Sequence, residues 1–286
     1  MFVVTGACGF IGSMMIKYLN SMGIDRIILI DDLNGMRHPN IKNTSFSYFY
    51  PMYWNELILP ERIHIDAVFH FGAISDTLEK NANKINMFNV EYTSKLATAC
   101  TKRNIPLIFS SSAAIYGNGN GPLNLYANSK LESETHISSS SVCMRLFNVY
   151  GPNEYHKNRM ASVIYKWFNE LKSTGTISIF ENSNLYNRDF IYVKDVCKVA
   201  YKFFEEYTPG IYDVGTGNNE NFDYVADCVI QNFGSGTKTI IPIPEDLRQQ
   251  YQTNTKATNL KYPNDLLNVE KGIIEYFKYL KDGKYG

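Results

Sequence analysis

Three side chains in the first half of the chain are of types that move protons in catalysis. Tyr126 and Lys130 stand four residues apart in a segment that predicts a helix, 126–137, so they share one helix face. An ammonium beside a phenol favours the phenolate, and the tyrosine can then exchange a proton with a substrate hydroxyl while hydride moves to a cofactor. Ser112, at the end of a predicted strand, would bond the same oxygen. An isolated pair of this kind is more often a solvated helix face, so the hypothesis depends on the elements around it.

A glycine turn lies between a predicted strand, residues 2–5, and a predicted helix, residues 10–22. Gly6 allows a tight turn, Gly9 lets the backbone approach a pyrophosphate, and Gly12 lets helix and strand pack closely. The phosphates would face free N–H groups at the helix N-terminus. A tight turn without a ligand is the alternative. The flanking strand and helix, with an acidic residue after the second strand, favour dinucleotide binding.

The acidic residue bears on which dinucleotide is bound. Asp31 would accept from the adenosine ribose hydroxyls, and Asp32 adds a second negative charge, which favours NAD. Arg37 lies close behind and could instead reach the 2′-phosphate of NADP. The sequence leaves NAD and NADP open.

The elements that position these residues alternate between apolar strands and helices, which predicts an α/β fold with a doubly wound parallel sheet of Rossmann type. Further strands are expected at 26–30, 65–71, 106–110 and 142–147, and a helix at 83–102. After Gly151-Pro152 the pattern predicts helices 160–172 and 193–206 and strands 177–180, 190–193 and 211–214.

No flexible linker divides the chain, so we expect a smaller, interleaved C-terminal α/β domain for the substrate. The predicted division gives residues 1–151 and about 189–217 to the dinucleotide-binding domain. It gives residues 152–188 and about 218–286 to the substrate-binding domain.

Composition narrows the function classes. The 286 residues carry 28 basic and 28 acidic side chains, and this zero net charge disfavours binding to nucleic acid or an anionic membrane. The chain opens directly on a strand and holds no long apolar run, so we expect a cytoplasmic protein without a secretory signal or membrane span. The five scattered cysteines indicate buried thiols and no metal site. A homo-oligomer stays open.

Together, the glycine turn, the Ser112 strand and the Tyr126/Lys130 pair resemble the extended short-chain dehydrogenase/reductase family, which contains the nucleotide-sugar epimerases and dehydratases. Residues 145–152, Arg-Leu-Phe-Asn-Val-Tyr-Gly-Pro, are similar to the family's strand that leads to the substrate domain. In the family's 4,6-dehydratases an acidic residue follows the active-site serine or threonine, whereas Ala113 and Ala114 follow Ser112 here. The resemblance therefore favours an epimerase over a dehydratase.

A narrower resemblance, to the ADP-glycero-manno-heptose 6-epimerases, runs nearly end to end. It rests on residues 153–162 (Asn-Glu-Tyr-His-Lys-Asn-Arg-Met-Ala-Ser), 69–75, 180–183, 188–193, 241–244 and 251–252. Inverting an exocyclic carbon requires removal of hydride and its return to the opposite face, so the oxygen occupies two positions. The resemblance implies that Tyr126 and Lys157 serve one position each, with a tightly bound cofactor for which the subfamily favours NADP. From spacing alone, His156-Lys157 is more often a solvated charge pair.

The resemblance also implies contacts for both ligands, a dinucleotide and a nucleotide-diphosphate sugar. The implied cofactor residues, besides those named above, are Phe10, Ile11, Phe71, Gly72, Ala73, Ser75, Asn89 and Val149. The implied substrate residues, besides Ser112, are Asn148, Arg159, Lys166, Phe180, Glu181, Arg188 and Tyr251, with Arg188 suited to a diphosphate.

Three departures from the subfamily suggest a retuned pocket. The stretch between Tyr116 and Tyr126 is short, the segment 41–60 is short and aromatic, and Arg159 and Lys166 replace other side chains. Another nucleotide-sugar epimerase, such as a 4-epimerase, or a keto-sugar reductase therefore remains an alternative. A non-catalytic dinucleotide-binding protein is a further alternative, which the intact proton relay disfavours.

Overall fold

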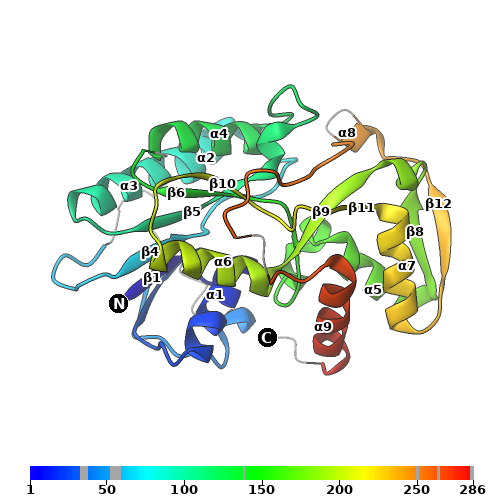
Figure 1. Cartoon of the computed structure of the whole chain (residues 1–286), viewed down its shortest axis with the longest axis horizontal. Coiled ribbons are helices and arrows are strands. Elements are labelled where there is room, and N and C mark those ends of the chain that lie inside the picture. Colours follow the sequence, from blue (N-terminus) through cyan, green and yellow to red (C-terminus); the bar gives the residue numbers. More distant parts are fainter. Residues whose placement is uncertain (33–37, 52–58, 138, 249–250, 263–264, 284–286) are drawn as a thin grey trace.

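The computed structural model describes residues 1–32, 38–51, 59–137, 139–248, 251–262 and 265–283. Its larger part is a parallel sheet of seven strands in the order β10-β6-β5-β4-β1-β2-β3 (Figure 1). The strands are β1 (Phe2–Thr5), β2 (Ile27–Asp31), β3 (Tyr48–Pro51), β4 (Ala67–His70), β5 (Leu107–Ser112), β6 (Val142–Leu146) and β10 (Gly210–Val214). The predicted doubly wound sheet of Rossmann type is confirmed.

Helices cover both faces of this sheet, which explains why its central strands are apolar over most of their length. One face carries α1 (Phe10–Ser21) and α6 (Val193–Glu205), which pack on each other. The other carries α2 (Ala82–Ile85), a π-helical turn η3 (Asn86–Glu91), α3 (Tyr92–Lys102) and α4 (Leu125–Ile137). In β1, Val4 packs into the core beneath α1 and α6, and its neighbour Val3 packs into the opposite core.

A smaller lobe follows the sheet. It contains a three-stranded sheet, β7 (Asn148–Tyr150), β9 (Asn187–Tyr192) and β11 (Asn219–Asn221), and a two-stranded sheet, β8 (Thr176–Phe180) and β12 (Thr237–Ile241). Around these strands lie α5 (Val163–Thr174), α7 (Phe222–Phe233), α8 (Glu245–Arg248) and α9 (Val269–Lys281). The remaining short helical turns are η2 (Pro39–Ile41), η4 (Ala113–Tyr116), η5 (Tyr155–Met160) and η6 (Ser183–Leu185). A separate aromatic core that includes Trp167, Phe190 and Phe277 holds this lobe together.

The chain crosses between the two parts more than once. β9 spans the predicted boundary near residue 189 and pairs with β7 on one side and β11 on the other. After β9 the chain returns to the main sheet through α6 and β10. No helix among the described residues is long and apolar enough to cross a membrane.

The structure contains strands that the sequence analysis did not predict, β3, β11 and β12 among them, and the predicted helix 83–102 is interrupted by η3. Strands β3 and β12 were not predicted, because both contain exposed positions and lack a continuous apolar run. The helix predicted from Met160 begins at Val163, because the Ser162 hydroxyl caps it by accepting from the Tyr165 amide at 3.2 Å.

Candidate active site

Two adjoining cavities lie where the main sheet meets the smaller lobe. The sheet-edge cavity, of about 850 Å³, is lined by residues that follow β1, β2, β4 and β5. The strand order reverses between β1 and β4, and this is where open α/β sheets bind ligands. The lobe cavity, of about 620 Å³, lies between α5, β8 and the segment near Tyr251. Both are lined by Thr77, Met160, Ala161, Val163 and Phe222, so the two cavities form one continuous site.

The glycine turn forms one wall of the sheet-edge cavity and fits a dinucleotide phosphate. A Cβ on Gly6, whose φ is +63°, would lie 2.6 Å from the Gly72 amide nitrogen, and a Cβ on Gly12 would collide with the Gly6 carbonyl. A Cβ on Gly9 would approach only the Gly6 carbonyl, at 3.1 Å, so the backbone there stays accessible. No side chain caps the first turn of α1 and no acidic residue lies in it. Its N-terminus therefore suits an anion.

Asp31 ends β2 beside this turn and lines the same cavity. Its Oδ2 accepts from the Cys8 amide at 2.6 Å, and its Oδ1 accepts from the Asp32 amide at 2.7 Å. Burial raises the pKa of Asp31, while the two amides oppose that rise. The carboxylate is thus fixed at the edge where the adenosine ribose of a dinucleotide would lie.

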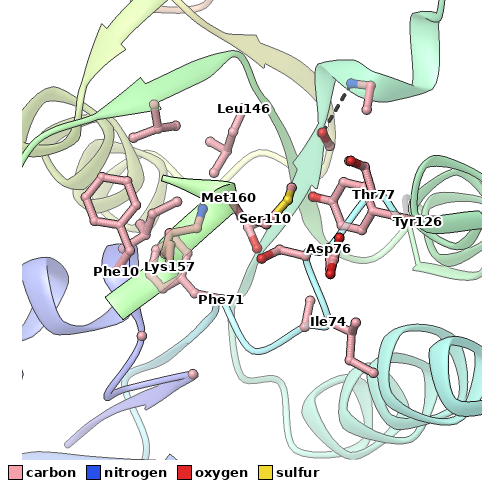
Figure 2. Close-up of a pocket in the computed structure, with 18 of the residues that line it drawn as sticks. Phe10, Phe71, Ile74, Asp76, Thr77, Ser110, Tyr126, Leu146, Lys157 and Met160 are labelled. Carbon is pink, nitrogen blue, oxygen red and sulfur yellow. Dashed lines mark hydrogen bonds between the residues drawn. The ribbon is translucent and has the colours of Figure 1, made fainter. Parts of the chain in front are cut away.

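The predicted proton-transfer group lies on one wall of the sheet-edge cavity (Figure 2). Burial raises the pKa of the Tyr126 phenol, and its hydrogen bond with Ser112 lowers it. Lys130 is buried; its Nζ donates to the Ser110 carbonyl at 2.8 Å and lies 6.0 Å from the Tyr126 ring centroid. Desolvation lowers the pKa of Lys130 to about 7. These side chains can hold and move a proton at a substrate oxygen near Tyr126.

A buried carboxylate that the sequence analysis did not single out supports this group. Glu134 lies one turn after Lys130, and its charge opposes the fall in the lysine's pKa. It accepts from the Ser111 hydroxyl at 2.5 Å and from the Arg145 guanidinium, whose Nε and NH2 nitrogens donate at 2.9 and 2.6 Å. The four-residue spacing from Lys130 was a signal in the sequence, but only the fold brings Arg145 to it.

Lys157 lines the same cavity from the 3₁₀ turn η5 of the smaller lobe. Figure 2 shows Lys157 and Tyr126 on either side of Met160. The Lys157 Nζ lies 5.5 Å from the Phe10 ring centroid and makes no hydrogen bond within the described structure. Desolvation lowers the pKa of Lys157, which Glu154 opposes and Lys166 reinforces. The lowered pKa makes Lys157 a better proton donor than a solvated lysine, and its neutral form can accept a proton.

Residues around Lys157 hold its turn in place. Glu154 is buried; it accepts from the Gly151 amide at 3.1 Å, the Ser162 amide at 2.5 Å and the Ser162 hydroxyl at 2.8 Å. The His156 ring nitrogen lies 3.2 Å from the Asn40 amide nitrogen, and Asn40 also donates to the Cys8 carbonyl in the glycine turn. The Lys157 turn is thereby tied to the dinucleotide side of the site.

The lobe cavity combines aromatic rings with cations. The Arg188 guanidinium lies 5.1 Å from the Tyr251 ring centroid and 5.3 Å from that of Phe222. Burial lowers the pKa of Arg188 to about 10, and no carboxylate of the described chain pairs with it. Phe180, Tyr251 and Lys166 line the same space. The combination suits a planar, negatively charged ligand.

The structure brings most of the predicted site residues to one of the two cavities. Asn89 instead lies behind the wall, where its side chain bonds the Ile74 amide, the Ile74 carbonyl and the Ser129 hydroxyl. Glu181 lines neither cavity, and its carboxylate lies 3.7 Å from Arg248. Arg37 lies outside the described residues. The predicted residues that do line a cavity are Gly6, Gly9, Phe10, Ile11, Gly12, Asp31, Asp32, Phe71, Gly72, Ala73, Ser75, Ser112, Tyr126, Lys130, Asn148, Val149, Lys157, Arg159, Lys166, Phe180, Arg188 and Tyr251.

The sequence is similar to that of known proteins. Residues 2–215 match the model of the NAD dependent epimerase/dehydratase family. The chain is 38% identical over 316 aligned residues to an ADP-L-glycero-D-manno-heptose-6-epimerase of Brachyspira hyodysenteriae, covering 100% of this chain and 99% of that one.

Solved structures share the fold at lower identity. An ADP-L-glycero-D-manno-heptose-6-epimerase of Helicobacter pylori superposes with a TM-score of 0.81 at 22% identity, covering 98% of this chain and 96% of that one. A UDP-N-acetylglucosamine 4-epimerase of Methanobrevibacter ruminantium, solved with UDP-N-acetylmuramic acid, gives a TM-score of 0.84 at 24% identity, covering 99% and 98%.

Proposed function

Because the chain belongs to the NAD dependent epimerase/dehydratase family, we propose that it is a nucleotide-diphosphate-sugar epimerase that inverts carbon 6 of ADP-glycero-manno-heptose. One observation carries the proposal: Tyr126 and Lys157 come from different parts of the fold and line one cavity with the glycine turn. When hydrogen leaves one face of a carbon and returns to the other, the oxygen occupies two positions, and two acid/base groups can serve one position each.

The residues have separate tasks in this reaction. A nicotinamide dinucleotide held by the glycine turn would supply the hydride acceptor and donor for this carbon. Tyr126 takes or gives the proton at the oxygen in one half-reaction, with the Lys130 ammonium favouring the phenolate and Ser112 orienting it. Lys157 serves the oxygen in the other, and burial keeps its pKa low enough for it to exchange a proton.

Polar groups of the two cavities suit the rest of the substrate. The Asn148 Nδ2 is buried without a hydrogen-bond partner in the described structure, and it lies in the sheet-edge cavity where a sugar hydroxyl could accept from it. Arg188 would take the diphosphate, and Phe180 and Tyr251 would contact the nucleoside. The absence of an acid beside Ser112, where Ala113 and Ala114 lie, disfavours dehydration.

We propose NAD as the resident cofactor. Asp31 lines the cavity as a buried carboxylate and Asp32 lies beside it, so a 2′-phosphate would meet two acidic side chains. Denaturing the purified protein and identifying the released dinucleotide by mass spectrometry tests this proposal. Recovery of NADP alone would contradict the NAD proposal and leave the epimerase proposal unaffected.

The main test is an NMR assay of the purified protein with ADP-D-glycero-D-manno-heptose and no added cofactor. We expect conversion to the L-glycero epimer, and about a 10²- to 10⁴-fold slower conversion by Lys157→Ala, the range typical for removal of a general acid or base. No conversion by folded wild-type protein that carries its dinucleotide would refute the heptose assignment. A panel of UDP-, GDP- and dTDP-sugars would then identify another epimerase substrate.

A further inference from the structure

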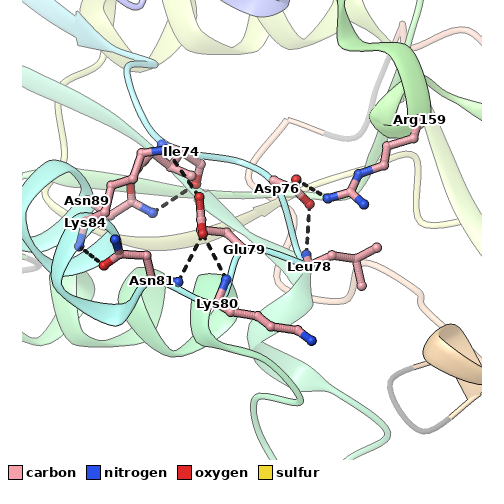
Figure 3. A network of polar contacts seen from close by, with 9 residues as sticks. All are labelled: Ile74, Asp76, Leu78, Glu79, Lys80, Asn81, Lys84, Asn89 and Arg159. Atoms are coloured by element: carbon pink, nitrogen blue, oxygen red, sulfur yellow. Dashed lines mark hydrogen bonds and ion pairs between the residues drawn. The ribbon is translucent and has the colours of Figure 1, made fainter.

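An ion pair crosses the seam between the two cavities. Arg159, in η5, places its NH2 nitrogen 2.6 Å from the Asp76 Oδ2 (Figure 3). Asp76 lies in the segment after β4, 83 residues earlier in the chain. The pair therefore connects the main sheet to the smaller lobe directly beside the site.

The segment that carries Asp76 is held in shape from both ends. At one end Asn89 bonds both the amide and the carbonyl of Ile74. At the other end the Glu79 carboxylate accepts from two backbone amides and from the Lys84 ammonium, as Figure 3 shows. Asp76 Oδ1 accepts from the Leu78 amide at 2.9 Å. The Asp76 carboxylate is thus presented across the seam by its own loop.

The position of the pair matches the path of an extended ligand. Asp76 lines the sheet-edge cavity, Arg159 lines the lobe cavity, and Thr77 and Met160 line both. A nucleotide sugar with its sugar near Tyr126 and its nucleoside in the lobe cavity must lay its diphosphate along this seam. The ion pair lies where those phosphate oxygens would pass.

The charges around the seam favour an anion. Arg159, Lys166 and Arg188 all line the lobe cavity, and the Lys166 Nζ donates to the Arg159 carbonyl at 2.6 Å. The Arg159 side chain is 61% exposed and that of Asp76 33%. Ion pairs as exposed as this contribute little to stability, whereas a guanidinium binds a diphosphate through paired, charge-assisted hydrogen bonds. Exchange of one anion for the other is therefore favourable.

We propose that Arg159 binds the diphosphate of the substrate. In the free enzyme Asp76 pairs with this arginine and so competes with the diphosphate for it. The proposal rests on the proposed function for the nature of the ligand. Substrate entry then replaces the Asp76–Arg159 pair with an Arg159–phosphate contact. Arg159 becomes a substrate-positioning residue, and Asp76 sets how tightly a diphosphate binds.

A double-mutant cycle tests the exchange, with ADP as the probe and calorimetry as the readout. We expect Arg159→Gln to weaken ADP binding about tenfold and Asp76→Asn to strengthen it about threefold, because asparagine keeps an acceptor for the Leu78 amide but loses the charge. In the Arg159→Gln background, Asp76→Asn should have no effect. All of these differences should vanish for adenosine. Lys80→Gln, which removes an exposed charge from the same segment and keeps the backbone amide that bonds Glu79, is the matched control and should leave ADP affinity unchanged.

The outcomes separate this proposal from the proposed function. An unchanged or weaker affinity in Asp76→Asn, or a gain that persists without Arg159, would overturn the exchange. If ADP does not bind but UDP or GDP shows the same pattern of affinity changes across the variants, the exchange is supported and the ADP assignment is refuted. An intact cycle with ADP but no epimerisation would support the exchange and refute the heptose reaction. Failure of folded wild-type protein to bind any of the three diphosphates would overturn both.

Discussion

Each of the two sides of the sheet-edge cavity carries a lysine near a buried carboxylate, but different contacts hold the two lysines in place. On the sheet side, Lys130 has a buried carboxylate, Glu134, one helical turn away. On the lobe side, Lys157 has a buried carboxylate, Glu154, three residues before it. In both cases desolvation lowers the lysine's pKa and the carboxylate opposes the fall.

The difference lies in what holds the ammonium group. Lys130 extends from α4, bonds the Ser110 carbonyl and lies 4.6 Å from the Phe109 ring centroid. Lys157 extends from a 3₁₀ turn, and the next residue, Asn158, has a φ of 47°. The Lys130 ammonium is fixed by a backbone acceptor, whereas the Lys157 Nζ makes no hydrogen bond within the described structure. More contacts therefore fix Lys130 than Lys157.

The largest expected effect on the reaction rate comes from a substitution on the sheet side of the cavity. Tyr126→Phe removes the phenol oxygen and should slow epimerisation about 10²- to 10⁴-fold without changing the thermal midpoint by more than a few degrees. Initial rates from the NMR assay and a thermal scan measure both quantities. Tyr48→Phe removes an exposed hydroxyl from the sheet edge and is the control. A Tyr126→Phe enzyme at wild-type rate would remove the distinction drawn between the two sides.

A smaller effect tests the support of Lys130. Glu134→Gln leaves the half-buried Arg145 without its charged partner, and we expect a loss of about 3 kcal/mol in the free energy of unfolding, measured in urea. The Glu134 charge raises the pKa of Lys130, so its removal should lower that pKa further below about 7. The alkaline fall in kcat/KM should then begin at a lower pH.

The control for this variant is Glu132→Gln, an exposed change on the same helix. It should leave both the unfolding free energy and the pH profile unchanged. A Glu134→Gln profile that coincides with the wild-type profile, or moves to higher pH, would show that Glu134 does not set the charge of Lys130.

The smallest effect tests the support of Lys157. Glu154→Gln replaces a carboxylate that accepts three hydrogen bonds with an amide that has one acceptor oxygen. We expect a loss of about 1–3 kcal/mol in the free energy of unfolding, again measured in urea. Glu205→Gln, an exposed change on α6, serves as the control. Equal losses for both variants would contradict the role given to Glu154 in holding the Lys157 turn.

The sequence was most informative where a residue's role follows from its local element. The strands β1, β2, β5 and β6 could be predicted because a strand covered on both faces is apolar along its length. The pair Tyr126 and Lys130 could be predicted because helix periodicity places both on one face. The glycine turn follows equally from the steric needs of its backbone.

Roles that arise from distant contacts could not be predicted in this way. Lys157 came only from a family resemblance, since a 3₁₀ turn has no sequence period that points its side chain into a cavity. Asp76 was not identified because its significance depends on Arg159, which only the packing of the smaller lobe brings close. The edge strand β12 was not predicted because its solvent-exposed residues obscure the apolar pattern.

Residues 117–118, directly after η4, bond a segment that is synthesised much later. Gln252 donates to the Gly117 carbonyl at 2.8 Å across 135 residues, and the Thr253 amide donates to Asn118 across the same separation. During synthesis the glycine turn, Tyr126 and Lys157 therefore leave the ribosome well before residues 251–253, which close one side of the lobe cavity. A nascent chain that ends before this segment has the glycine turn but lacks Tyr251 and that wall of the lobe cavity. The lobe cavity is thus completed only after residues 251–253 have been made.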